Sequence, residues 1–125
     1  MKQFGFSKQE RIRTTKDFKR VFNKKQKCIS KYFNLYWANN DNTHLTRIGI
    51  VISKKIGKAY VRNKIKRLIR ETYRLNKRSI KKSCDIIFLC KPEIKQLNNY
   101  YLMKEQIFYV LDNANLLISK TKECK

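Results

Sequence analysis

The stretch Arg47-Ile-Gly-Ile-Val-Ile-Ser-Lys-Lys-Ile-Gly-Lys-Ala-Tyr-Val-Arg-Asn-Lys-Ile-Lys-Arg-Leu-Ile-Arg-Glu71 joins a predicted strand to a predicted helix and decides the fold class. Its first part, residues 47–53, alternates as a half-buried strand does, with one face made of Ile48, Ile50 and Ile52. From about Ala59 to Arg78 the apolar residues recur every three or four positions, which predicts an amphipathic helix. A strand therefore leads directly into a long helix.

The predicted helix carries two neighbouring stripes of different chemistry. The apolar stripe consists of Ile65, Leu68, Ile69, Thr72 and Leu75. The second, which we call the basic stripe, consists of Arg62, Lys66, Arg70, Tyr73 and Lys77. A helix face that merely meets solvent usually pairs opposite charges along the helix. Because Glu71 is the only acid in this helix, the basic stripe favours contact with a polyanion over the alternative of a solvated face.

Two more helices and further strands surround this unit. Thr14 or Thr15 can cap a first helix, with Asp17 in its first turn and one apolar face formed by Phe18, Val21 and Phe22. Residues 32–38 alternate and residues 85–90 form a short apolar run, so both predict strands, and 25–30 is a candidate extra strand. The last helix spans 98–119, with a core stripe of Met103, Ile107, Val110, Ala114 and Leu117. This order predicts one sheet covered by helices, in an α+β or α/β fold.

Charge separates a basic part of the chain from a nearly neutral part. The 125 residues suffice for one compact domain, and they carry 31 Lys and Arg against nine Asp and Glu, a net charge of +22. Most of the excess lies in residues 8–31 and 54–82, interleaved with aromatic residues. Rings that stack on bases, set among charges that bind phosphates, favour nucleic acid as the polyanion. With no apolar run of about 20 residues and no signal peptide, we expect a cytoplasmic protein without a membrane partner.

We do not expect the chain to carry an active site of its own. Its nine acids are scattered, whereas acid–base or metal-assisted chemistry needs carboxylates that converge. The single histidine, His44, lies in a turn-forming segment, and the three glycines are isolated. The four cysteines include no Cys-x-x-Cys pair, so a zinc site is not expected. Cys84 and Cys90, six residues apart in a predicted strand, should be buried packing residues.

The segment 51–71 resembles the signature of the bacterial ribonuclease P protein family, Ser-x-Ser-Lys-Lys-x-Gly-x-Ala-x-x-Arg-Asn-Arg-x-Lys-Arg-x-x-Arg-Glu. Residues 11–13, 16–22 and 33–36 look like further blocks of the family, and the resemblance covers about 8–118. Two positions depart from the pattern. Lys64 stands where the family has the second arginine of Arg-Asn-Arg, which keeps the charge but loses the bidentate fork, and Val51 stands where serine is common.

The resemblance implies a fold and a division of labour. The fold is a single αβββαβα domain of the α+β class over residues 1–125, similar to the second domain of ribosomal protein S5. It contains a left-handed β-α-β crossover, which the general right-handed rule would not predict. The function is that of the protein subunit of ribonuclease P, the endoribonuclease that removes the 5′ leader from precursor transfer RNA. In the family the RNA subunit binds Mg²⁺ and performs the hydrolysis. The protein binds that RNA and the single-stranded leader, is not catalytic alone, and takes no small-molecule substrate.

The resemblance also assigns residues to each RNA. The leader would be bound by Phe18, Phe22, Tyr36, Ser53, Lys54, Lys55, Lys66 and Arg70. The catalytic RNA would be bound by Arg11, Arg13, Arg62, Asn63, Lys64 and Arg67. Plain core packing is the alternative for Phe22. Asp41, in the turn that follows residue 38, is a weak candidate for a divalent ion because one carboxylate makes a poor site.

Three other functions remain open from the residues alone. A ribosomal or other RNA-scaffolding protein shares the composition, and only the signature separates it from this chain. A protein-only nuclease would need the cluster of carboxylates that the sequence does not supply. A helix that binds a membrane surface would need an apolar stripe that the core requires here.

Overall fold

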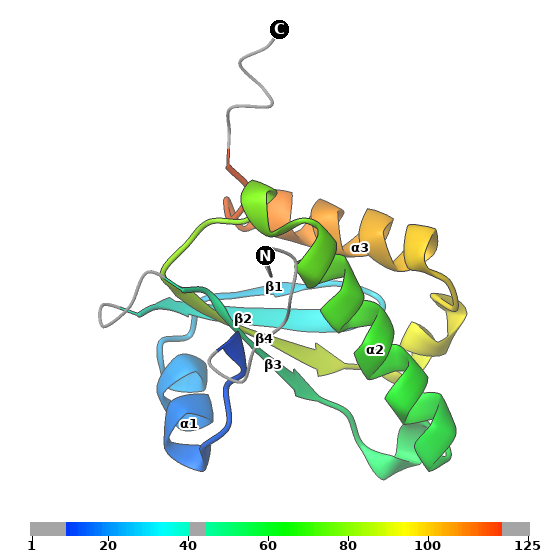
Figure 1. Cartoon of the computed structure of the whole chain (residues 1–125). Helices are drawn as coiled ribbons and strands as arrows, with labels where there is room; N and C mark the ends of the chain where they lie inside the picture. Colours follow the sequence, from blue (N-terminus) through cyan, green and yellow to red (C-terminus); the bar gives the residue numbers. More distant parts are fainter. Residues whose placement is uncertain (1–9, 41–44, 119–125) are drawn as a thin grey trace, which may run out of the picture.

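The four-stranded sheet has the strand order β1-β2-β4-β3, and three helices pack against it (Figure 1). The structure is a computed structural model that describes residues 10–40 and 45–118. The elements are α1 (Thr15–Asn23), β1 (Lys27–Ile29), β2 (Phe33–Asn39), β3 (Arg47–Val51), α2 (Ala59–Leu75), β4 (Cys84–Cys90) and α3 (Tyr100–Asn113). Short 3-10 helices follow β3, α2 and β4, namely η2 (Lys54–Ile56), η3 (Lys77–Ser79) and η4 (Pro92–Gln96). This is the predicted αβββαβα order, and the candidate strand within 25–30 is confirmed as β1.

Strand pairing produces the predicted crossover. β2 pairs antiparallel with both β1 and β4, whereas β3 pairs parallel with β4, with Ile48 opposite Ile86. Helix α2 connects β3 to β4, and in Figure 1 this connection passes over the sheet in the left-handed sense. β4 lies between β2 and β3, and six of its seven residues are buried, with burial on both faces. Its position inside the sheet explains the continuous apolar run in its sequence.

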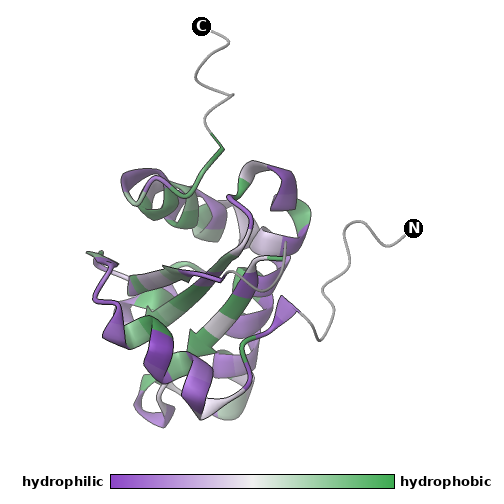
Figure 2. Ribbon diagram, turned by 90° about the vertical axis from the view of Figure 1, so that its left-hand side faces the viewer, coloured by the Kyte–Doolittle hydropathy of each residue, from purple (hydrophilic) through white to green (hydrophobic). Residues whose placement is uncertain are grey.

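The helices cover the two faces of the sheet unequally. α2 and α3 lie on one face, which we call the closed face, and α1 lies on the other, the α1 face (Figure 1). The closed face holds the main core, which includes Phe33, Leu35, Phe88, Ile69 and Met103. The α1 face holds a smaller cluster of buried residues, namely Ile12, Val21, Ala38 and Ile87. In Figure 2 the strands are largely hydrophobic, whereas α1 is largely hydrophilic.

The structure confirms the predicted cap of the first helix and the predicted burial of two cysteines. Thr14 caps α1, because its hydroxyl oxygen accepts a hydrogen bond from the Asp17 N–H at 3.1 Å. Cys84 and Cys90 are both buried in the main core, as predicted. In the part of the chain that the structure describes, no helix is long and apolar enough to cross a membrane. Each of these features depends on residues close together in the sequence.

The helix ends differ from the predictions. α2 ends at Leu75 rather than Arg78, because Asn76 leaves the helical conformation and donates from its side chain to the Thr72 carbonyl at 2.7 Å. α3 covers 100–113 rather than 98–119, because Asn99 caps its start and Asn115 adopts a left-handed conformation with φ 61° beyond its end. Leu75, placed in the apolar stripe, is 41% exposed, whereas Tyr73, placed in the basic stripe, is buried.

Candidate nucleic-acid interface

Three aromatic side chains, which we call the aromatic cluster, lie together on the α1 face. Phe18 and Phe22 come from neighbouring turns of α1 and Tyr36 comes from β2, and all three are half-buried around the smaller core. The period of two along β2 places Tyr36 on this face and Leu35 on the closed face. The Phe22 and Tyr36 rings meet edge to face with their centroids 4.7 Å apart. The three rings predicted to bind the leader are thus brought together, and each keeps part of its surface exposed.

Gly49 of β3 allows the Phe18 ring to lie directly on the sheet. A Cβ at position 49 would be 2.8 Å from Cε1 and 3.0 Å from Cζ of Phe18. It would also be 3.3 Å from the Cβ of Ile12. Real Cβ atoms do not approach a carbon as closely as 2.8 Å, so a larger residue would displace the ring. The absence of a side chain at Gly49 therefore sets the depth at which Phe18 sits.

A buried carboxylate ties α1 to the sheet beside these rings. Asp85, which is fully buried at the start of β4, accepts two hydrogen bonds from Arg47, at 2.8 Å from Nε and 2.7 Å from Nη2. Asn40 donates to the same carboxylate at 3.0 Å, and Arg20 of α1 forms an ion pair with it. The hydrogen bond to Asp85 is the main reason why the pKa of Arg47 is raised, and Arg47 also contacts Asp17 of α1 at 3.3 Å. We call these five residues the Asp85 network.

Sequence reasoning did not find the Asp85 network. It treated Asp85 as the start of an apolar strand and Asp17 as a residue of the first helical turn. One signal was present, because an acidic residue next to a continuous apolar run is buried only with charged or hydrogen-bonding partners. The identity of those partners depends on the pairing of β3 with β4 and on the packing of α1, which the sequence does not show directly.

Lys54 and Lys55 follow the end of β3 in the 3-10 helix η2, and both are exposed. Ser53 is the N-cap of this turn, since its hydroxyl oxygen accepts a hydrogen bond from the Lys55 N–H at 3.0 Å. The strand therefore ends at Val51, two residues earlier than predicted. Ser53 already uses its oxygen in this cap, but the same hydroxyl can still donate a hydrogen bond to a phosphate.

The middle of the basic stripe lies near the β3 edge of the sheet. Arg11 forms a β-bridge with Ile48 of β3 and lies close to Arg70. Burial lowers the pKa of Arg70, and the charge of Arg11 lowers it further. Burial also raises the pKa of the Cys90 thiol to about 12, against the opposing effect of the nearby Lys66 charge. The sequence assigned Arg11 and Arg70 to different RNAs, yet the charge of Arg11 acts on Arg70 in the fold.

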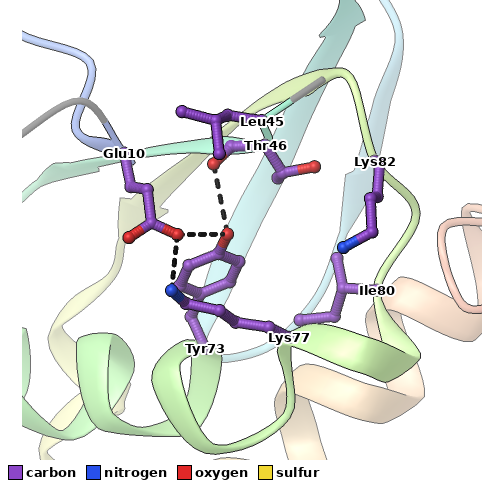
Figure 3. A pocket seen from close by; sticks show the side chains of 7 residues that line it. All are labelled: Glu10, Leu45, Thr46, Tyr73, Lys77, Ile80 and Lys82. Atoms are coloured by element: carbon purple, nitrogen blue, oxygen red, sulfur yellow. Dashed lines mark hydrogen bonds and ion pairs between the residues drawn. The ribbon is translucent and has the colours of Figure 1, made fainter. Parts of the chain in front are cut away.

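Figure 3 shows that the last part of the basic stripe is engaged within the protein. The Glu10 Oε2 atom lies 2.8 Å from the Lys77 ammonium and accepts a hydrogen bond from the Tyr73 hydroxyl at 3.1 Å. The same hydroxyl is 3.2 Å from the Thr46 carbonyl oxygen. These residues line a cavity of about 190 Å³ together with Leu45, Ile80 and Lys82.

The sequence predicted that the basic stripe as a whole favours contact with a polyanion. The contacts of Glu10 correct this prediction for Tyr73 and Lys77. Tyr73 and Lys77 do have an acidic partner, but Glu10 comes from the N-terminal segment, where a helical wheel cannot show it. The pKa of Tyr73 is raised, chiefly by burial and then by the Glu10 charge, so the hydroxyl remains protonated and can keep donating. The cluster anchors residues 10–13 beside α2.

Four of the six residues predicted to meet the catalytic RNA lie in the first half of α2, namely Arg62, Asn63, Lys64 and Arg67. Asn63, Lys64 and Arg67 are exposed, and so is Arg13 from the N-terminal segment. Arg62 is half-buried, because its Nε donates to the Gly57 carbonyl at 3.0 Å. The first turn of α2 contains no acid, so the positive end of the helix dipole adds to the side-chain charges. These residues form a cationic surface.

Four acidic side chains in the described ranges, 10–40 and 45–118, are engaged by cations. Glu10, Asp17, Glu71 and Asp85 each contact a cationic side chain. No group of three His, Cys, Asp or Glu within these ranges is arranged to hold a metal ion. Asp41 and His44 lie outside the described residues, so the weak ion site at Asp41 stays a prediction. The arrangement is suited to binding phosphates and stacking on bases.

Comparison with known proteins gives a consistent result. A family model described as Ribonuclease P matches residues 6–113. A protein of Dictyoglomus turgidum named ribonuclease P protein component is 38% identical over 117 residues, which cover 91% of this chain and 96% of that protein. The solved structures similar to this chain include two RNase P protein structures from Staphylococcus aureus, both with a TM-score of 0.80. The first is 33% identical and covers 87% of this chain and 98% of its own. The second, a mutant described as defective in mRNA degradation activity, is 34% identical and covers 87% and 91%.

Proposed function

Because this chain belongs to the ribonuclease P protein family, the protein subunits of an endoribonuclease, we propose that it binds the catalytic RNA subunit and the single-stranded 5′ leader of precursor transfer RNA. By holding both RNAs it promotes cleavage of the leader and so produces the mature 5′ end. The partners are ribonuclease P RNA and precursor transfer RNA, and the place of action is the cytoplasm.

The observation that carries this proposal is the position of the aromatic cluster relative to the basic side chains. Phe18 lies against β3, and the 3-10 helix that bears Lys54 and Lys55 follows the end of that strand. Arg11 bridges to the outer edge of the same strand, and its charge acts on Arg70 of α2. An unpaired strand needs ring surfaces for its bases and cations for its phosphates within the length of a few nucleotides. β3 supports both kinds of group, so we assign the leader to this region.

The catalytic RNA is assigned to the cationic surface at the start of α2, around Asn63, Lys64 and Arg67. These side chains are exposed and lie on a rigid helix, which suits contact with the backbone of a folded RNA. Arg11 is less clearly assigned to the catalytic RNA, because its charge acts on Arg70 of the leader region. We propose that Arg11 stands where the two RNAs approach each other.

The Mg²⁺ that the enzyme requires does not fit the described residues of this chain. Its preferred ligands are carboxylate and other oxygen atoms, and no group of three His, Cys, Asp or Glu within residues 10–40 and 45–118 is arranged to hold a metal ion. We therefore propose that the RNA subunit binds the metal and performs the hydrolysis. The residues of this chain bind and orient the RNAs.

Reconstitution tests the proposal directly. Cleavage of precursor transfer RNA is measured with the protein alone, with a bacterial ribonuclease P RNA alone, and with both, at low Mg²⁺ concentration. We expect no cleavage by the protein alone and faster cleavage by the pair than by the RNA alone. An mRNA substrate is included with the protein alone, because the Staphylococcus aureus mutant is described by its mRNA degradation activity. RNA cleavage by rigorously purified protein would contradict the assignment of all chemistry to the RNA.

A further inference from the structure

A second site with an aromatic side chain lies at the start of α2, whereas the contacts of Glu10 lie at the other end of this helix. Between the first half of α2 and the segment around η4 there is a groove of about 180 Å³. We call it the Tyr60 groove. Its lining consists of Tyr60, Val61, Lys64, Ile65, Leu68, Lys95, Leu97 and Asn98. Neither the aromatic cluster nor the Asp85 network contributes a residue to it.

The groove combines an apolar floor with a polar rim. Ile65 and Leu97 are each only 4% exposed, so they close the bottom, whereas Lys64, Lys95 and Asn98 are exposed. The Tyr60 side chain is 73% exposed, although a tyrosine ring usually gains from burial. No acidic residue lines the groove. An exposed aromatic ring therefore lines the same groove as two ammonium groups and an amide.

The size and charge of the groove select its occupant. Pockets for drug-sized ligands usually enclose about 300–1,000 Å³, so this one has room for a single ring system. A nucleotide matches the remaining features: its base can stack on Tyr60, its polar edge can bond to the Asn98 amide, and its phosphates can pair with Lys64 and Lys95. An apolar peptide segment would leave both lysines unmatched.

We propose that the Tyr60 groove binds one unstacked nucleotide of the catalytic RNA, in addition to the backbone contacts of the surrounding cationic surface. This inference rests on the proposed function, since Lys64 belongs to both the groove and that surface. RNA is recognised mainly where unpaired bases in loops and bulges can be splayed out. Backbone contacts alone would hold any structured RNA, so the groove adds selectivity for an RNA with an extruded base at this position.

Binding of a bacterial ribonuclease P RNA to the full-length protein tests the inference, with Tyr60→Ala, Tyr60→Phe and Tyr109→Ala compared with the wild type. Tyr109 is a matched control, because it is 62% exposed on α3 and does not line the groove. We expect Tyr60→Ala to weaken binding about tenfold, as the loss of one stacked base should. Tyr60→Phe, which keeps the ring, and Tyr109→Ala should bind as the wild type does. Because Tyr60 is uncharged, the salt dependence of Tyr60→Ala should be unchanged.

The outcomes separate this inference from the proposed function. If the wild-type protein binds the RNA and Tyr60→Ala binds as well as Tyr109→Ala does, the nucleotide site is wrong and the proposed function stands. If the wild-type protein does not bind the RNA, the proposed function itself fails. If the effect of Tyr60→Ala on substrate binding by the holoenzyme depends on leader length, the ring contacts the leader, which also overturns the inference. Thermal melts of all variants should coincide, since both tyrosines are exposed.

Discussion

The two faces of the sheet differ in how completely their helices cover them. On the closed face, α2 and α3 bury whole rings and branched side chains, such as Phe33 and Met103, at 0% exposure. On the α1 face, α1 has nine residues, of which only Val21 is buried, and the rings of Phe18, Phe22 and Tyr36 stay half-buried. The closed face thus supplies most of the stability. The α1 face leaves part of each ring exposed, which is the surface that we propose for an RNA base.

The two faces are also held in different ways. The helices of the closed face are held by apolar contacts spread over many side chains. The short α1 has few such contacts, and its link to the sheet includes the charged Asp85 network. A charged contact depends on a few atoms. A single substitution in the Asp85 network should therefore loosen α1 without unfolding the main core. The following substitutions test this contrast, beginning with the largest expected effect.

Replacing a ring on each face should have very different costs. Phe33→Ala removes a fully buried ring from the closed face and should lower the free energy of unfolding by about 3–5 kcal/mol. Phe22→Ala removes a half-buried ring from the α1 face and should cost about 1–1.5 kcal/mol, roughly half the value for burying a whole ring. Urea denaturation followed by circular dichroism measures both. Equal costs would mean that the α1 face is as much core as the closed face.

Asp85→Asn should loosen α1 from the sheet. The change leaves Arg20 and Arg47 without their shared carboxylate and should cost about 2–3 kcal/mol, less than for a fully buried pair because both arginines are partly exposed. Affinity for the leader should fall, while affinity for the catalytic RNA, which we assign to α2, should be retained. Glu71→Gln is the control, since it breaks a more exposed ion pair with Arg74 and should change the free energy of unfolding much less than Asp85→Asn does. Parallel loss of both RNA affinities would show that the network supports the whole fold.

Phe18→Ala should weaken binding of precursor transfer RNA about tenfold, the effect expected for one lost stacking contact. The loss should shrink for a substrate whose leader is cut to one or two nucleotides, because the base that the ring would meet is then missing. Arg67→Ala is the contrasting variant, because Arg67 is exposed on α2 and should affect the catalytic RNA at any leader length. Arg67 is preferable to Arg62, whose side chain also bonds to the Gly57 carbonyl. A folded Phe18→Ala protein that loses long and short leaders equally would place the leader elsewhere.

Lys66→Ala should have the smallest effect of these substitutions, and we expect it in the salt dependence of the RNA affinity. Removing one phosphate contact to a single strand flattens the slope of the logarithm of the affinity against the logarithm of the salt concentration by about 0.7. Lys104→Ala provides the control, as it removes the same charge from α3, which carries none of the residues assigned to the leader. Affinity measured at four or more salt concentrations gives the slope. An unchanged slope in a natively folded Lys66→Ala protein would mean that Lys66 is only solvated.

Several features could be predicted from the sequence because they depend on near neighbours. The period of two placed Tyr36 and Leu35 on opposite faces, and the capping chemistry of Thr14 marked the start of α1. Tyr73 shows where this reasoning stops. Its helical position puts it in the basic stripe, yet it is buried against Glu10, a residue 63 positions away in the chain. A helical wheel reports angles within one helix and cannot show what packs on it.

By itself the sequence determined the order of helices and strands, the large positive charge and the resemblance to one family, since these follow from composition, local periodicity and a continuous motif. Only the tertiary structure decided which charges neutralise one another. Arg20 meets Asp85 across 65 positions, Arg47 meets the same carboxylate across 38, and Lys77 meets Glu10 of the N-terminal segment. The tertiary structure also brought α2 and the segment around η4 together to form the Tyr60 groove. The physical reason is that such contacts form between side chains from distant segments, and their partners are chosen by how the helices and sheet pack rather than by spacing along the chain.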